Sequence, residues 1–112
     1  MNIEFATAKL ESTANDFAKL EKLCRKQKAH CTADDILERL NVLASADSMA
    51  DVPPSIRPHP LHGNLKGKFA VDVSKTHRII FRPDHEEDPD FRIDNRNTIK
   101  RIVVEELCAD YH

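Results

Sequence analysis

A cluster of prolines near the middle of the chain constrains the fold more than any other feature of the sequence. Pro53, Pro54, Pro58 and Pro60 stand in the stretch "VPPSIRPHP". Proline lacks the backbone N–H that helices and central strands use, and it pushes the residue before it toward extended backbone. Residues 48–60 are therefore predicted to form a loop, and the two halves that it separates differ in periodicity.

The half before the loop favours helices. Apolar residues recur at helical spacing from Leu10 to about Lys28, and neither Gly nor Pro interrupts them. The same spacing returns in residues 30–46, where Thr32 followed by Asp35 resembles a capping box. Two amphipathic helices with a short break between them predict an antiparallel helical hairpin. Its apolar positions are Leu10, Phe17, Leu20, Cys24, Ile36, Leu40 and Leu43.

The half after the loop favours strands. Residues 67–73 ("GKFAVDV") and 77–83 ("HRIIFRP") alternate around a short turn, which predicts an antiparallel pair. Residues 98–107 ("TIKRIVVEEL") are rich in β-branched residues and predict the last strand. Residues 84–97 are predicted to be a long polar loop. Residues 2–6 ("NIEFA") are predicted to be a starting strand that joins the same sheet.

This order of elements predicts an α+β domain that spans residues 1–112. The helices would pack on one face of a small, twisted, mostly antiparallel sheet, because both kinds of element must bury an apolar side. A chain of 112 residues has the usual length of one domain and can bury a core without disulfides or metals.

Composition and the first residues bear on location. Hydrophobic residues make up 40% of the chain and charged residues 32%, as in globular proteins with a charged surface. No apolar run approaches the ~20 residues that cross a bilayer. The start "MNIEFATAKL" lacks the basic, apolar and small-residue regions of a signal peptide. We expect a cytoplasmic protein with no membrane partner.

The charge distribution is asymmetric. The net charge is −2, but residues 55–82 contain a single acid, Asp72. The bases of that segment are Arg57, Lys66, Lys68, Lys75, Arg78 and Arg82. Such a chain can present a basic face despite its net charge, although a solvated mixed surface fits the same pattern.

The cysteines and histidines give no metal signature. Cys24, Cys31 and Cys108 are odd in number and widely spaced, so neither a disulfide framework nor a zinc site is indicated. Cys24 lies at a helical core spacing and is predicted to be a small buried hydrophobe. "HPLH" places His59 and His62 three apart, and "DHEED" clusters acids around another His, but neither spacing matches an established metal motif. We expect no metal and no cofactor.

Two stretches hold most of the residues that can move protons, "RPHPLHGNLKGKF" and the tail "DYH". A ribonuclease without a metal needs a base for the 2′-hydroxyl, cations for the phosphate and an acid for the leaving 5′-oxygen. Imidazole, with a pKa of about 6.5, suits the base and the acid, and Arg suits the phosphate. His59, Arg78 and His112 would supply this set. Tyr111 could stack on a base or donate a hydrogen bond, and Asp110 could orient an imidazole or act as a base itself.

Ordinary structural roles fit the same residues. A His between two prolines, such as His59, is typical of a surface loop. Arg78 at the start of a strand is typical of a solvated cross-strand charge, and Tyr111 of the edge of a core. The residues alone therefore support a small α+β domain with a candidate acid–base site.

The order and spacing of the motifs resemble a known family. Over nearly its whole length the chain is similar to the HigB-like toxins, the plasmid maintenance killer branch of the RelE/ParE superfamily of toxin–antitoxin modules. The similar pieces are "IEFATAKL", "ILERLNVLASADSMADVP", "PHPLHGNLKGKFAVDVSKTHRIIFRPDHE" and the closing "DYH".

The resemblance implies a fold, an activity and partners. The fold is a twisted antiparallel sheet with a helical hairpin on one side. The activity is cleavage of mRNA on the ribosome, which inhibits translation, and a cognate helix-turn-helix antitoxin holds it in check. The catalytic residues implied are His59, Arg78, Asp110, Tyr111 and His112. The residues expected to contact RNA or the ribosome are Arg57, His62, Lys66, Lys68 and Arg82.

Two alternatives stay open at this point. The superfamily also contains ParE-like toxins, which inhibit a topoisomerase without cutting anything, and one fold serves both activities. The chain could also be a degenerate toxin that acts only as the partner of its antitoxin. His59 and the terminal Asp-Tyr-His favour the nuclease, because a binding protein does not need several proton-transfer groups.

Overall fold

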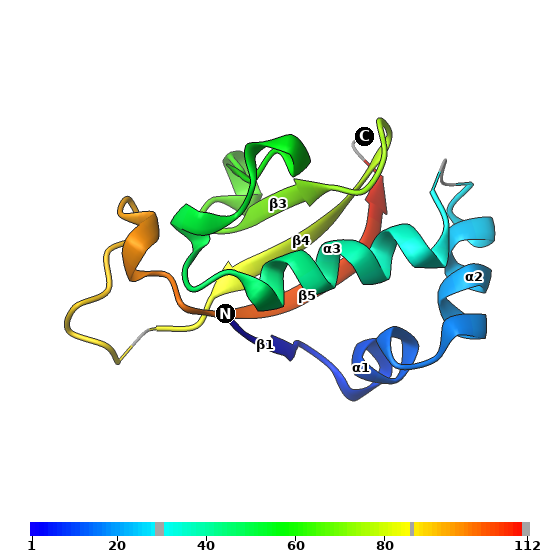
Figure 1. The fold of residues 1–112 in the computed structure, drawn as a ribbon, viewed down its shortest axis with the longest axis horizontal. Coiled ribbons are helices and arrows are strands. Elements are labelled where there is room, and N and C mark those ends of the chain that lie inside the picture. Colours follow the sequence, from blue (N-terminus) through cyan, green and yellow to red (C-terminus); the bar gives the residue numbers. More distant parts are fainter. Residues whose placement is uncertain (29–30, 86, 111–112) are drawn as a thin grey trace.

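The computed structural model of the protein describes residues 1–28, 31–85 and 87–110. Within these ranges the α-helices are α1 (Ala8–Ala14), α2 (Phe17–Lys26) and α3 (Ala33–Ser45). The strands are β1 (Asn2–Phe5), β2 (His59–Pro60), β3 (Phe69–Asp72), β4 (His77–Pro83) and β5 (Arg101–Asp110). Figure 1 shows α3 lying along the sheet, with α2 at one end of it. None of the helices described is long and apolar enough to cross a membrane.

The sheet is mixed but mostly antiparallel, which confirms the predicted α+β class. Its strand order is β1-β5-β4-β3-β2, and among these strands only β1 runs parallel to its neighbour. The predicted starting strand thus joins the sheet beside the last strand, with Asn2 opposite Arg101. Parallel neighbours need a long connection, and here the helices and three other strands lie between them in the sequence.

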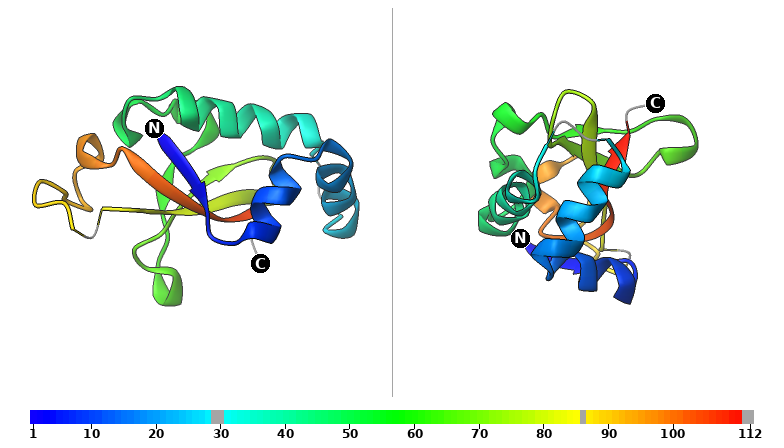
Figure 2. Two further views of the ribbon diagram at one scale, coloured as in Figure 1. Left: turned by 90° about the horizontal axis from the view of Figure 1, so that it is seen from below. Right: turned by 90° about the vertical axis from the view of Figure 1, so that its right-hand side faces the viewer.

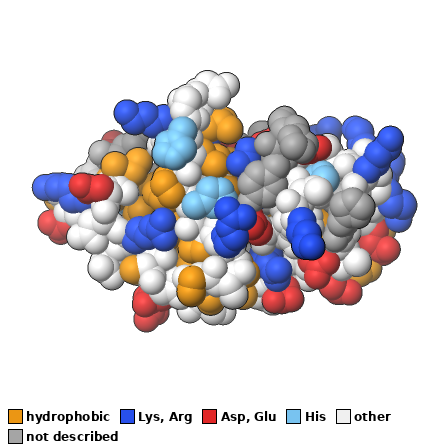
Figure 3. Space-filling view, turned by 90° about the horizontal axis from the view of Figure 1, so that it is seen from above, with side chains coloured by type: hydrophobic (Ala, Val, Ile, Leu, Met, Phe, Trp, Pro, Cys, Tyr) orange, Lys and Arg blue, Asp and Glu red, His pale blue; other side chains and the backbone are white. Residues whose placement is uncertain are grey.

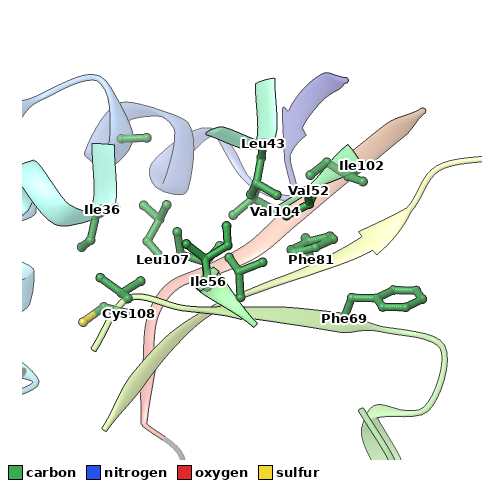
Figure 4. Close-up of a cluster of buried hydrophobic side chains, with 14 of the residues drawn as sticks. Ile36, Leu43, Val52, Ile56, Phe69, Phe81, Ile102, Val104, Leu107 and Cys108 are labelled. Carbon is green, nitrogen blue, oxygen red and sulfur yellow. The ribbon is translucent and has the colours of Figure 1, made fainter. Parts of the chain in front are cut away.

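The main core lies between α3 and the sheet. Ile36 and Leu43 are fully buried. Figure 4 shows both side chains pointing from α3 toward Val104 and Leu107 of β5. Burying a side chain of this size stabilises a fold by about 1.5–3 kcal/mol, so this layer holds α3 on the sheet. None of the α-helices that the structure describes lies on the opposite face of β3 and β4 (Figure 2).

The start of α3 confirms the predicted capping box. The Thr32 hydroxyl accepts a hydrogen bond from the backbone N–H of Asp35, and the Asp35 carboxylate accepts one from the backbone N–H of Thr32 at 2.8 Å. These two bonds satisfy donors that a helix start otherwise leaves unpaired.

The first predicted helix is two helices in the structure. The Asp16 carboxylate accepts a hydrogen bond from the Lys19 N–H and caps a new helix, α2, which is separated from the end of α1 by two residues. Phe17 opens α2 and is 47% exposed, although the continuous pattern placed it among the apolar positions. Figures 1 and 2 show α2 turned across the end of α3.

The proline-rich segment, residues 48–60, packs against the main core. Val52 and Ile56 are buried, and the chain forms two short 3₁₀ turns there. His59 and Pro60, predicted to belong to a loop, form the short edge strand β2 beside Phe69 and Ala70. An edge strand tolerates proline because its missing N–H would face away from the sheet.

His85 anchors the long polar segment that follows β4. Its ring is buried, and Nε2 accepts hydrogen bonds from the backbone N–H groups of Lys100 and Arg101 at 2.9 and 3.0 Å. Nε2 is therefore the unprotonated nitrogen, and Nδ1 donates to the Asp88 carboxylate at 3.4 Å. The Asp90 N–H and the His85 ring hold the pKa of Asp88 below its ordinary value.

The three cysteines, far apart in the sequence, meet in the structure. Cys24 of α2 and Cys108 of β5 are buried, as predicted for Cys24, and Cys31 is half-buried beside them. Burial raises the pKa of the Cys108 thiol to about 11, and the neighbouring Cys24 adds to the effect. Burial and the adjacent sulfur atoms raise the pKa of Cys31 further. All three are free thiols.

Candidate functional site

Several of the candidate residues share the face of the sheet that α3 does not cover. Side chains alternate between the two faces of a strand. Val71 and Ile79 belong to the main core, so Asp72 and Arg78, which are opposite each other in the β3–β4 register, lie on the other face. This helix-free face has a small apolar centre of its own, made of Leu61, Ala70, Ile80 and Ala109.

His59 enters this face from the edge strand. It is opposite Ala70 in the β2–β3 register, and its side chain is half-buried. Its Nδ1 lies 2.6 Å from the carbonyl oxygen of Arg57. A carbonyl can only accept, so Nδ1 carries a proton and Nε2 is the basic nitrogen of the neutral ring. The backbone thus fixes both the orientation and the tautomer of His59, as a proton-transfer group requires.

Asp72 holds Arg57 and lies opposite Arg78 in the strand register. Its carboxylate pairs with the Arg57 guanidinium at 3.0 Å, and its side chain is only 18% exposed. Its register partner on β4 is Arg78. Arg39 of α3 donates to the backbone carbonyl of Asp72 at 3.0 Å, which ties this point of the sheet to the helical layer. The carboxylate positions the Arg57 guanidinium on this face, a role that the sequence did not predict for Asp72.

Lys68 forms a second ion pair on the same face. Its ammonium lies 2.9 Å from the Glu105 carboxylate, and the two side chains are 31% and 21% exposed. Glu105, like Asp72, was missed by the sequence reasoning, because only the strand register brings it beside a basic residue. Arg82 follows Arg78 and Ile80 on the same side of β4 and is half-buried.

A hollow of about 410 Å³ adjoins this face. On one side it is lined by His62, Lys66 and Lys68 of the predicted basic segment. On the other side it is lined by Ile93, Asp94 and Arg96, with Ile93 48% exposed. Figure 3 shows a face of the molecule where Lys, Arg and His side chains stand around apolar ones. An apolar floor with cations at its rim suits a nucleotide, whose base stacks while its phosphate pairs with the cations.

The tail is described only as far as Asp110. Asp110 is exposed and lies opposite His77 in the β4–β5 register, whereas the partner of Arg78 is Ala109. His77 is buried on the helix side, where its Nε2 lies 3.1 Å from the Gln27 carbonyl oxygen. Alternation therefore places the Asp110 position on the opposite face of the sheet from Arg78. Tyr111 and His112, both predicted site residues, lie outside the described residues.

The structure thus brings His59, Arg57, Arg78, Lys68 and Arg82 to one face of the sheet, and it sets His62 and Lys66 beside the adjoining hollow. The arrangement offers one imidazole of fixed tautomer together with guanidinium groups. Such a set can transfer a proton and neutralise a phosphate.

Comparisons with known proteins identify the fold. Neither protein-family models nor curated protein sequences give a match to the chain. Among solved structures, the chain is similar to a YoeB/ParE toxin from Agrobacterium tumefaciens, with 16% identity, a TM-score of 0.53 and full coverage of both chains.

The same comparison finds two structures of YoeB-YefM complexes from Staphylococcus aureus, one of them heterotetrameric. The identities are 18% and 17% and the TM-scores 0.54 and 0.52, with all of this chain and 97% of each neighbouring chain covered. The fold is therefore that of the YoeB/ParE toxins, as the resemblance to the RelE/ParE superfamily implied.

Proposed function

We propose that the protein is the toxin of a type II toxin–antitoxin module, of the HigB-like branch, and that it cuts mRNA on the ribosome. The observation that carries the proposal is the helix-free face of the sheet. There an imidazole held in one tautomer shares the face with three arginines, and one of them, Arg57, is paired with the Asp72 carboxylate. The fold shared with YoeB/ParE toxins supports it.

The proposed reaction uses the 2′-hydroxyl of the RNA as the nucleophile. The 2′-oxygen attacks the adjacent phosphorus, the bond from phosphorus to the 5′-oxygen breaks, and a 2′,3′-cyclic phosphate and a 5′-hydroxyl result. One group takes the proton of the 2′-hydroxyl and another gives a proton to the 5′-oxygen. His59 fills one of these roles, and Tyr111 or His112 of the tail fills the other. Asp110, which the strand register places on the opposite face of the sheet from Arg78, is not assigned to this step.

The arginines stabilise the charge that builds on the phosphate. Arg78 belongs to a central strand of the sheet, and Arg57 is paired with Asp72, the register partner of Arg78. Donors that are fixed before the reaction stabilise developing charge at little reorganisation cost. His62, Lys66 and Lys68 border the adjoining hollow, and we assign them, with Arg82, to binding of RNA or ribosome.

The proposed partner in the cell is a cognate helix-turn-helix antitoxin. Two of the similar structures are complexes of a toxin with the protein YefM. By analogy, an antitoxin would bind this chain and keep it inactive until the antitoxin is degraded.

Induced expression with mapping of mRNA 5′ ends tests the proposal. The wild-type chain should stop growth and create new 5′ ends inside open reading frames within minutes. His59→Ala and His112→Ala should create few or none. Lys75→Ala, on the exposed turn between β3 and β4, is the matched control and should behave as wild type. Growth arrest without new mRNA ends, together with an inhibited topoisomerase, would instead favour a ParE-like activity.

A further inference from the structure

The cysteines form a cluster where α2, the start of α3 and β5 meet. Cys24 comes from α2, Cys31 immediately precedes the capping residue Thr32, and Cys108 comes from β5. The three sulfur atoms all lie within 4.8 Å of one another, and those of Cys24 and Cys31 are 4.0 Å apart. Of the His, Cys, Asp and Glu side chains that the structure describes, no other three come together in this way.

The spacing of the sulfur atoms fits a metal ion better than a disulfide. Zinc–thiolate bonds are about 2.3 Å long, so two sulfurs on one tetrahedral ion lie about 3.8 Å apart. The 4.0 Å between Cys24 and Cys31 is already close to that separation, and the other pairs need shifts of less than about 1 Å. A disulfide would need an S–S distance of about 2.05 Å, half of the present one.

An ion can reach the cluster from solvent. Cys24 and Cys31 line a surface hollow of about 170 Å³ together with Glu21, Arg25 and Thr32. Glu21 precedes Cys24 by one helical turn, so its carboxylate is on the same side of α2. Three sulfur ligands on one side and a carboxylate or water on the open side make a complete set for a four-coordinate ion. The sulfurs alone suffice for a three-coordinate one.

We propose that Cys24, Cys31 and Cys108 form a three-thiolate site for a soft cation of the Zn²⁺ or Cu(I) class. Thiolates select these ions over hard ones such as Mg²⁺ and Ca²⁺. Each thiol loses its proton to solvent as its sulfur binds, so the bound ion replaces three protons. The ion joins α2 and the segment that leads into α3 to β5, the strand that carries Asp110. It therefore stabilises the end of the sheet from which the tail departs.

The test uses the full-length chain, reduced and freed of metal. Zn²⁺ is measured by competition with a chromophoric chelator and Co²⁺ by its thiolate charge-transfer absorption. Cu(I) is measured by competition with a Cu(I) chelator. We expect one ion per chain, an intense sulfur-to-cobalt band, a higher Tm with the bound ion and protection of all three thiols from alkylation. Tight binding of Cu(I) alone would identify a three-coordinate site, and binding of Zn²⁺ weakened by Glu21→Gln a four-coordinate one.

Cys31→Ser is the informative variant, because Cys31 is only half-buried and a serine of similar size there should leave the packing of the hydrophobic core unchanged. Circular dichroism should show it folded, with the charge-transfer band lost and the metal affinity reduced at least tenfold. The six histidines of the chain can bind Zn²⁺ weakly, and uptake by this variant measures that background. Equal uptake by wild type and Cys31→Ser would overturn the proposal, as would alkylation of the wild-type thiols at the same rate with and without the ion.

Discussion

Asp72 shows how single residues prepare the proposed site. Its largely buried carboxylate lies 3.0 Å from the guanidinium of the exposed Arg57. In the strand register, Asp72 is opposite Arg78. The pair with Arg57 is worth at most about 1 kcal/mol, since one partner is largely in solvent. The pair matters for geometry, because it fixes where the Arg57 guanidinium lies before a phosphate binds.

Replacing Arg78 should damage activity far more than replacing a nearby exposed base. Loss of one fixed donor at a developing charge costs about 3–4 kcal/mol, so Arg78→Ala should lower the cleavage rate by about 10²–10³-fold. Lys75→Ala, in the exposed turn, should change it little. Single-turnover cleavage with the two purified variants gives the comparison. Equal rates would mean that Arg78 only adds to a diffuse basic surface.

The Asp88 carboxylate should make stability depend on pH in a narrow acidic window. Its pKa in the folded chain lies below its ordinary value of 3.8, mainly through the Asp90 N–H and then His85. The folded state therefore favours the ionised form. The resulting stability is fully present above pH 3.8 and is lost as the pH falls through the lower folded value.

Urea unfolding of wild type and Asp88→Asn from pH 2 to 7 checks this. The difference in free energy of unfolding should be constant near neutrality and should shrink as the pH falls below about 4. Asp90→Asn keeps the backbone donor and serves as the control. A difference that does not change with pH would contradict the assignment.

The capping box of α3 is the local element on which the helical layer depends. Thr32→Ala removes one side of the box and should destabilise the fold by about 1 kcal/mol. The matched control is Ser55→Ala, an exposed residue that caps no α-helix. Thermal unfolding measured by circular dichroism should separate the two variants by several degrees. Identical melting curves would show that packing alone sets the start of α3.

The end of β5 should matter for activity but not for folding. Deleting Asp110, Tyr111 and His112 leaves the buried residues of β5 in place, because Asp110 itself is exposed. Removing a general acid or base typically lowers a rate by about 10²–10⁴-fold, so growth inhibition should vanish. The melting temperature should change little. A truncated chain that is folded and still stops growth would exclude the tail from the site.

Local signals in the sequence predicted local structure well. Three predictions rested on residues that are close together in the sequence, and all are confirmed. They are the Thr32–Asp35 capping box, the antiparallel pair β3–β4 and the final strand. The break before α2 was missed because Asp16 sits inside an uninterrupted apolar pattern, and a side-chain cap outweighed it. The strand β2 was missed because its pairing depends on Phe69 and Ala70, not on its own prolines.

At the scale of the whole molecule, the features that the sequence did not predict are those that depend on distant contacts. The wide spacing of the cysteines in the sequence did not predict that they meet, yet the packing of α2 and α3 on β5 brings their sulfur atoms within 4.8 Å of one another. The sequence did not predict a role for Asp72 or Glu105. Only the folded sheet brings them beside Arg57 and Lys68, with which they form ion pairs. Periodicity predicts which face of an element is buried, but not which elements meet.

The whole molecule should also need the ribosome in order to cut. Its net charge is −2, and Arg57 and Lys68 of the basic segment are already paired with acids of the same chain. Few cations remain to hold a long single strand by counterion release. The ribosome would instead present the mRNA in position, and such orientation can contribute about 7–11 kcal/mol to a rate.

The most direct test of the central claim is a cleavage assay of the purified protein on one defined mRNA, with and without programmed ribosomes. We expect cuts only with ribosomes, at a rate that falls as salt rises and that falls further when Lys66 and Lys68 are both changed to Glu. His59→Ala, shown to be folded, should leave the mRNA intact. Efficient cutting of naked RNA would contradict the ribosome dependence, and intact mRNA in both reactions would contradict the proposed nuclease.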